Sequence, residues 1–589
     1  MRFACRQTRQ SPRGIASGFA LAMTALFILC PTPYALRPAL TMDFSAHGYF
    51  RTRAEALQNP DTQTTNTSLA HPNNRAGLVS FNQMRARLEP TLKVNDHLSL
   101  HTQFDVLDNV VFGTEETKQL ELLSPVVGTV TLPAGPGSVS MGGGEAGENK
   151  ALNFRRAYMD ILTPVGKLRV GRQPSHWGLG IFQNDGNGRQ GDFGDTTDRI
   201  LFMTQYEFND GGALSGGVLW DIAFEAQSDP RIQGFAGNIT ANSKDTHQYA
   251  AILLYERPEF SAGVFGGVRR RSSKGGTTTT ALGATDDDAD GTLDDFHNAG
   301  IDGNTLVYFG DIYGRYTYEE YNFKAEYVFI GGKMSTGVAI NAIPFFACAG
   351  SACTSGSVVD GIISLPAEQD VQVSLAALEA NGVYKWGGEW NFKGGLAQGD
   401  ASPLSQRITQ YGFRPDYNVA LLMFNVPLGT SPAMYGANTL GQADQKLTGG
   451  QPITGNFVNN AIYASVGYMH HLDIRDAIKD CNDFSVGGRV TTAWAHKNAV
   501  DLNFQALLSN GTLPVLRNSS KWYGVEADLV TEAELYDHLY ASLEAGVLVP
   551  GGAYDIKVED AVLGTQVDPI PFDNAEISYG GRLTLMLEF

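Results

Sequence analysis

The last fifteen residues of the chain, 575–589, alternate between apolar and polar side chains and end on an aromatic residue. Because successive side chains of an extended strand point to opposite faces, this segment has one apolar face and one polar face. The apolar face carries Tyr579, Gly581, Leu583, Leu585, Leu587 and Phe589. A tilted strand of roughly 9 to 11 residues is long enough to cross a bilayer. The pattern therefore predicts a membrane-spanning strand, with an edge strand of a soluble β-protein as the alternative.

A final strand that ends in Phe, with aromatic or aliphatic residues at every second position before it, resembles the terminal strand of Gram-negative outer-membrane β-barrels. This resemblance implies that the barrel-assembly machinery binds the strand and that outer-membrane lipid and lipopolysaccharide surround the folded chain. Two further segments, GRQPSHWGLG at 171–180 and FRPDY at 413–417, resemble porin-like outer-membrane proteins of the myxobacterial type. They support a barrel and identify no substrate.

Composition and charge narrow the class of protein further. The chain has 67 Gly and 10% aromatic residues, whereas its 43% hydrophobic residues fall slightly below the usual apolar share. That balance suits half-polar strands better than membrane-spanning helices. The formal charge of -19 and the sequence pI near 5.0 argue against a nucleic-acid partner, which would require a basic surface.

The N-terminal segment has the pattern of a secretory signal. Four arginines in the first thirteen residues precede an apolar run from 15 to 29, and prolines and small residues follow. We therefore expect residues 1–39 to be a signal peptide and residues 40–589 to form one barrel in the bacterial outer membrane. No later segment has the roughly 18 consecutive apolar residues of a membrane helix.

Alternating positions along the rest of the chain predict an all-β fold, a transmembrane antiparallel barrel of about 18 strands within a range of about 16 to 20. The expected strands are 43–57, 84–94, 98–106, 151–162, 167–172, 199–207, 214–225, 245–256, 260–271, 305–316, 321–332, 368–380, 389–399, 459–471, 484–495, 519–530, 538–549 and 576–589. The fifth, at 167–172, is the shortest.

The connections between these strands differ at their two ends. After each even-numbered strand the connection is short, as at 95–96 and at NDGG (209–212), whereas the other connections run from about 19 to about 59 residues. Short periplasmic turns and long extracellular loops are typical of bacterial outer-membrane barrels. A barrel of about 16 to 18 strands leaves an aqueous channel, so the predicted size indicates a pore.

One long loop, 272–304, carries an acidic motif. Asp286, Asp288 and Asp290 match the first half of a calcium-binding loop, but His297 stands where the bidentate Glu is expected. Ca²⁺ binding is one hypothesis for this loop, and a solvated acidic segment is the other. We expect no other cofactor.

Three cysteines follow the expected signal peptide. Cys348 and Cys353 lie five residues apart and could close a disulfide in an oxidising compartment, since a metal site would need more ligands nearby. Cys481 is left without an assigned role.

One or both of two long loops are expected to fold into the lumen and narrow it. Loop 173–198 joins an arginine-ended strand to a segment rich in Trp and Gly, and loop 400–458 contains the apolar stretch FRPDYNVALLMFNVPLG. An extracellular loop should not leave such a patch in water. The alternative is an extra hairpin at 415–427, which would give twenty strands.

Charged side chains are predicted on the lumenal face. The basic group comprises Arg51, Arg53, Arg85, Arg87, Arg156, Arg169 and Arg582. The acidic group comprises Glu526, Asp528 and Glu544. A basic wall beside an acidic one would set a field that selects polar solutes. The alternative is that these charges pair locally.

The function that follows is passive diffusion of small hydrophilic solutes, with sugars or organic anions as candidates because Tyr49, Tyr158 and Tyr313 also face inward. A barrel plugged by its loops, acting as a surface scaffold or adhesin, is the alternative. Enzyme activity is not expected, because no acyl-transfer, zinc or nucleotide signature accompanies the histidines. Oligomeric state has no sequence signal here.

Overall fold

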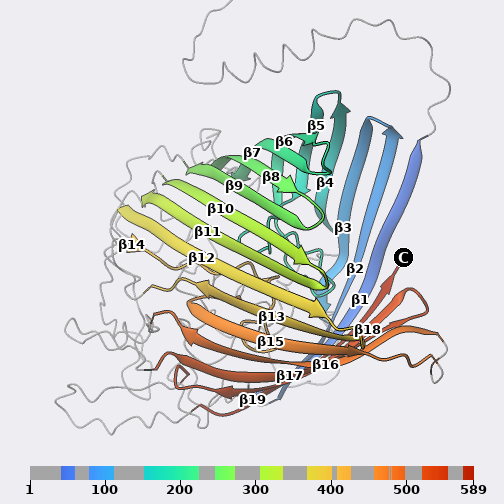
Figure 1. Cartoon of the computed structure of the whole chain (residues 1–589), viewed down its shortest axis with the longest axis vertical. Coiled ribbons are helices and arrows are strands. Elements are labelled where there is room, and N and C mark those ends of the chain that lie inside the picture. Colours follow the sequence, from blue (N-terminus) through green and yellow to red (C-terminus); the bar gives the residue numbers. More distant parts are fainter. Residues whose placement is uncertain are drawn as a thin grey trace, which may run out of the picture.

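The computed structural model of the protein consists of strands that belong to one sheet (Figure 1). It describes residues 42–59, 78–111, 152–224, 246–271, 305–335, 368–400, 407–425, 457–475, 478, 480–497, 520–554 and 575–589. Within these ranges no helix is long and apolar enough to cross a membrane.

The strands of the N-terminal half are β1 (Asp43–Gln58), β2 (Leu78–Asn95), β3 (Leu98–Val111), β4 (Leu152–Thr163), β5 (Gly166–Pro174), β6 (Thr196–Glu207), β7 (Ala213–Phe224), β8 (Thr246–Glu256) and β9 (Phe260–Arg271). The remaining strands are β10 (Thr305–Tyr318), β11 (Tyr321–Ser335), β12 (Glu368–Val383), β13 (Gly388–Ala397), β14 (Arg407–Ile408), β15 (Ala461–His471), β16 (Cys481–Ala495), β17 (Trp522–Leu535), β18 (Leu539–Pro550) and β19 (Ser578–Glu588).

The sheet closes on itself into a barrel. Each long strand pairs antiparallel with the next, and β1 pairs antiparallel with β19. The two-residue β14 pairs in parallel with β12, whereas β13 pairs directly with β15. In the part of the chain that the structure describes, eighteen strands therefore form the closed wall. The predicted fold class and strand number are confirmed.

The two faces of the wall differ as the alternation predicts. On β19, Leu583 and Leu587 are exposed on the outer surface, while Arg582 and Thr584, on either side of Leu583, are buried inside. The same division holds on β1, where Phe50 is exposed and Arg51 is buried. An outer surface of exposed apolar side chains is suited to lipid and not to water.

The two rims of the barrel also differ. Turns such as 96–97, 164–165 and 319–320 join strands at one rim, which we call the short-turn rim. At the opposite, long-loop rim, the connections are much longer, as between β3 and β4 or between β13 and β15. The predicted asymmetry of the connections is confirmed.

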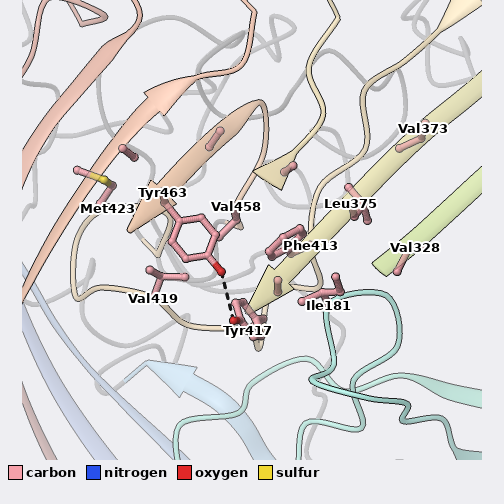
Figure 2. Packing of buried hydrophobic residues seen from close by; sticks show 14 of the residues in the cluster. Ile181, Val328, Val373, Leu375, Phe413, Tyr417, Val419, Met423, Val458 and Tyr463 are labelled. Carbon is pink, nitrogen blue, oxygen red and sulfur yellow. Dashed lines mark hydrogen bonds between the residues drawn. The ribbon is translucent and has the colours of Figure 1, made fainter. Parts of the chain in front are cut away.

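The interior is less uniformly polar than expected. Val328 of β11 and Leu375 of β12 point inward and are buried against Phe413 and Tyr417, which follow β14 (Figure 2). Tyr463 of β15 also joins this cluster, and its hydroxyl donates to the Tyr417 hydroxyl (3.2 Å). Residues 415–425 form no strand, so the hairpin alternative at 415–427 is wrong over its described part. The apolar stretch is instead covered by the inner wall, which removes it from water.

The C-terminal residue lies at the seam between the first and last strands. The Gly48 N–H donates to the Phe589 carbonyl (2.9 Å), and the Phe589 N–H donates to the Gly48 carbonyl (3.0 Å). Deleting Phe589 would leave both Gly48 groups unpaired, and each unsatisfied group costs about 1–3 kcal/mol. We expect the free energy of unfolding in detergent micelles to fall by at least about 1 kcal/mol in a urea titration. Phe589→Leu keeps both backbone bonds and should lose less; an equal loss would contradict this account.

Candidate functional site in the barrel lumen

Two segments between strands occupy the lumen, and we name them loop 175–195 and loop 409–425. Loop 175–195 joins β5 to β6, and loop 409–425 follows β14. Both bond to side chains that point inward from distant strands, as the following contacts show. The prediction that one or both of loops 173–198 and 400–458 fold into the lumen is confirmed, and the described parts of both loops do so.

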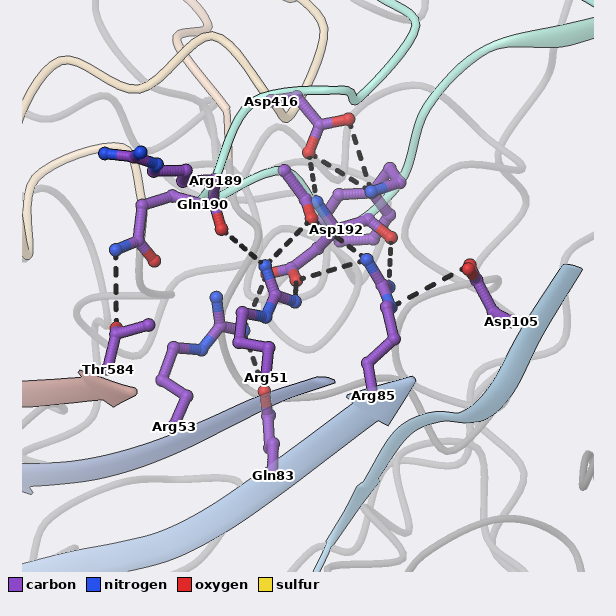
Figure 3. Close-up of polar contacts among 12 residues, drawn as sticks. Arg51, Arg53, Gln83, Arg85, Asp105, Arg189, Gln190, Asp192, Asp416 and Thr584 are labelled. Atoms are coloured by element: carbon purple, nitrogen blue, oxygen red, sulfur yellow. Dashed lines mark hydrogen bonds and ion pairs between the residues drawn. The ribbon is translucent and has the colours of Figure 1, made fainter. Parts of the chain in front are cut away.

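Asp192 anchors loop 175–195 to the arginines of β1 and β2 (Figure 3). Arg51 Nη2 lies 2.5 Å from Asp192 Oδ1, and Arg53 Nη2 lies 2.7 Å from Asp192 Oδ2. Arg85 Nη2 donates to the Asp192 carbonyl (2.8 Å), and its Nη1 donates to the Gly191 carbonyl (3.0 Å). All three guanidinium groups are buried, so this carboxylate is a shared counter-ion.

The charges around Asp192 also fix its ionisation state. Burial alone would raise the pKa of the Asp192 carboxyl, but Arg53, Arg51 and Arg85 outweigh it and hold the pKa well below the ordinary value of 3.8. The carboxylate is therefore ionised throughout the neutral and mildly acidic range.

Asp416 joins the two loops to each other. Its carboxylate accepts hydrogen bonds from the backbone N–H groups of Asp192 (2.7 Å), Phe193 (3.1 Å) and Gly194 (2.6 Å). Beside it, Arg414 forms an ion pair with Asp195. Three successive N–H groups aimed at one carboxylate form a concave anion-binding turn. Loop 409–425 therefore holds the turn that carries Asp192.

Carboxylates on the wall bind the other parts of the loops. Glu326 of β11 accepts a hydrogen bond from the Leu179 N–H. Glu526 of β17 accepts from the N–H groups of Leu422 (2.7 Å) and Met423 (2.6 Å). A buried loop without strand partners leaves its N–H groups unpaired, and these side chains satisfy them.

Most of the predicted lumenal charges have a partner on the same or a neighbouring element. Arg87 donates to Asp105 through Nε (2.7 Å) and Nη2 (2.9 Å), and Arg169 Nε donates to Asp160 (2.6 Å). The remaining contacts join Arg156 to the Asp185 carbonyl (2.6 Å), Arg582 to Glu55 (3.4 Å), Arg489 to Asp528 (2.7 Å) and Arg489 to Glu544 (3.9 Å). The contacts favour local pairing over two open walls of opposite sign. A role for these residues in lining a pore stays a prediction.

Sequence reasoning missed the residues that complete this arrangement. Asp192 and Asp416 lie in loops, where no periodic pattern assigns a direction to a side chain. The only signal for Asp416 is the Pro-Asp pair in FRPDY, which favours a turn.

The predicted calcium and disulfide residues, Asp286, Asp288, Asp290, Cys348 and Cys353, lie outside the described residues. Cys481 is a buried free cysteine, and the described ranges contain no group of three side chains suited to a metal ion.

Water reaches several charged side chains of the inner wall near the loops. The exposed fractions of the Lys324, Lys393 and Arg489 side chains are 32%, 34% and 22%. On the part of the wall formed by β4 and β5, the Arg169 Cζ atom lies 4.4 Å from the centroid of the Tyr158 ring, and the Arg169 side chain is 21% exposed. The lumen is thus a wetted, charged space that two anchored loops narrow.

Comparisons with known proteins give distant matches only. No protein-family model matches the chain, and no curated protein matches it. Among solved structures, the chain is similar to an anion-selective porin from Comamonas acidovorans (11% identity, 93% of this chain and 100% of that chain covered, TM-score 0.36). It is also similar to a BenF-like porin from Pseudomonas fluorescens Pf-5 (10%, 93% and 98%, TM-score 0.38) and to Pseudomonas aeruginosa OpdK with vanillate (11%, 92% and 98%, TM-score 0.37). Scores this low carry no inference about substrate, so the assignment of the fold depends on the strand pairing itself.

Proposed function

We propose that the protein is an outer-membrane channel through which small hydrophilic solutes diffuse passively, with loops 175–195 and 409–425 as its constriction. The observation that carries this proposal is the wetted inner wall around two loops held by ion pairs and hydrogen bonds. A barrel of about 18 strands is wide enough for an aqueous passage. Sugars and organic anions are the solutes that fit a wall of arginines and tyrosines.

The main alternative is a scaffold or adhesin whose lumen the loops close, and the apolar cluster around Phe413 and Tyr417 favours it. Single-channel recording in planar bilayers separates the two functions. Discrete open steps support the channel, whereas a silent bilayer that contains folded protein supports the scaffold. A liposome-swelling series with sugars and organic acids then ranks the solutes.

Neutralising Arg85 and Arg87 should shift ion selectivity toward cations. Arg87 pairs with Asp105, so Arg85→Gln with Arg87→Gln removes two positive charges and leaves that carboxylate behind. One unit charge about 8 Å from an ion in water changes its energy by roughly 0.5 kcal/mol, or about two-fold in occupancy. We expect the cation-to-anion permeability ratio from reversal potentials to rise at least about two-fold. Arg172→Gln, on the outer face, is the control, and an unchanged ratio in the lumenal variant would refute a lumenal field.

A further inference from the structure

A row of basic side chains crosses the outer face of the barrel near the long-loop rim. Residues at one register level on β8 to β11 are His247, Arg270, Leu306 and Lys333. These positions share the outward face with the exposed Tyr249, Val268 and Tyr308. Three of the four residues in the row are thus basic, on a protein with a formal charge of -19.

Aromatic side chains mark the depth of this row in a membrane. One register step toward the short-turn rim lie Trp220, Tyr249 and Tyr308 on β7, β8 and β10. The Trp220 and Tyr249 rings stack (centroids 6.5 Å apart, 7° between planes), and Tyr308 packs on Phe329 (6.0 Å). Such aromatic girdles lie at the boundary between hydrocarbon and headgroups. On each strand the basic row therefore lies two residues nearer the long-loop rim, about 7 Å along the strand and about 5 Å along the membrane normal at a tilt of about 40°, on the side where lipid phosphates are found.

The donors in the row suit a phosphate group. The Arg270 and Lys333 side chains are exposed on the outer face. His247 accepts a hydrogen bond from the Trp220 indole N–H at Nδ1 (3.4 Å), which leaves its Nε2 as the donor. Asp370 of β12 lies beside Lys333 and limits the row on that side. The imidazole and guanidinium donors on the paired strands β8 and β9, and the ammonium on β11 beyond Leu306, can bind one phosphate or two adjacent ones.

We propose that His247, Arg270 and Lys333 bind the phosphate groups of the lipid A part of lipopolysaccharide. The proposal rests on the proposed location in the outer membrane. There, lipopolysaccharide forms the outer leaflet, which surrounds the end of the barrel at the long-loop rim. The site is formed by the strands themselves and needs neither lumenal loop. It would fix lipid at β8 to β11, the part of the wall opposite the β1–β19 seam.

The test is lipid binding to the full-length folded protein in detergent micelles, followed by native mass spectrometry. The titrants are bisphosphorylated lipid A, dephosphorylated lipid A and inorganic phosphate. We expect retention of bisphosphorylated lipid A only. Arg270→Gln with Lys333→Gln should weaken its binding roughly 25-fold, since each basic residue contributes about fivefold to binding an anionic lipid surface. Lys385→Gln with Arg475→Gln, at exposed positions near the short-turn rim, removes the same charge and should leave binding unchanged.

Three results would overturn the proposal: equal binding of dephosphorylated lipid A, saturable binding of inorganic phosphate alone, or equal affinity in the Arg270 and Lys333 variant. Folding of each variant is checked by the heat-dependent gel mobility of the barrel, and exposed positions leave the sheet intact. Channel conductance of the same variants is recorded separately. A lost lipid site with normal conductance supports the proposal, while a silent channel with normal lipid binding refutes only the proposed function.

Discussion

Asp192→Ala should raise single-channel conductance at least about two-fold while the barrel stays folded. The substitution leaves Arg51, Arg53 and Arg85 without the carboxylate that contacts them, and removing one partner of a buried ion pair costs about 3–5 kcal/mol. The hydrogen bonds between the strands do not involve Asp192, so the substitution destabilises the bound position of loop 175–195 and not the barrel. We expect this loop to leave the wall and to widen the constriction.

Planar-bilayer recording measures the conductance, and limited proteolysis between 175 and 195 reports release of the loop. Asp185→Ala is the matched control, because Asp185 lies in the same loop and its side chain is 23% exposed. An unchanged conductance, with the loop equally resistant to protease, would show that Asp192 does not hold the constriction.

The depressed pKa of Asp192 gives this anchor a defined pH response. A carboxyl whose folded-state pKa lies below its ordinary value of 3.8 stabilises the folded arrangement above that value and loses this contribution as pH falls through the folded pKa. The Asp192 carboxylate is therefore fully ionised, and its ion pairs with the arginines have full strength, at every pH above about 5. Conductance steps that change between pH 5 and pH 8 would have to arise from other groups.

The strands were predictable because a period of two is a local property of the sequence. In 575–589, each residue's neighbours alone fix its face, and the burial of Arg582 and exposure of Leu583 follow. The inward direction of Arg51 and Arg85 was predictable in the same way. Their partners were not, because Asp192 lies more than a hundred residues away in a loop whose path depends on the closed wall.

The apolar cluster around Phe413 and Tyr417 inside the lumen was harder to predict from the sequence than the strands. On β11, residues 327–330 read YVFI, so both faces of the strand are apolar there. A continuous apolar run indicates a strand buried on both sides. Tyr327 is exposed on the outer surface, and Val328 meets the apolar cluster inside. The run could have indicated an occupied interior, but not which loop occupies it.

Asp416→Ala should also release loop 175–195, by removing its contact with loop 409–425. Its carboxylate accepts from three consecutive N–H groups, and each hydrogen bond to a charged group contributes about 1.5–3 kcal/mol. Without it the turn that presents Asp192 to the arginines loses its support. We expect a conductance increase similar to that of Asp192→Ala, and a smaller one for Asp416→Asn, which keeps one acceptor oxygen.

A double-mutant cycle then tests whether the two loops act as one unit. If Asp416 acts by holding the turn that carries Asp192, the double variant should conduct no more than the stronger single variant. The coupling between them should lie at about 0.5–3 kcal/mol, as for residues that share one network. Free energies come from the ratio of narrow to wide dwell times in each variant. Additive effects would mean that each loop is held independently, and that the contacts of Asp416 with residues 192–194 do not control the width of the lumen.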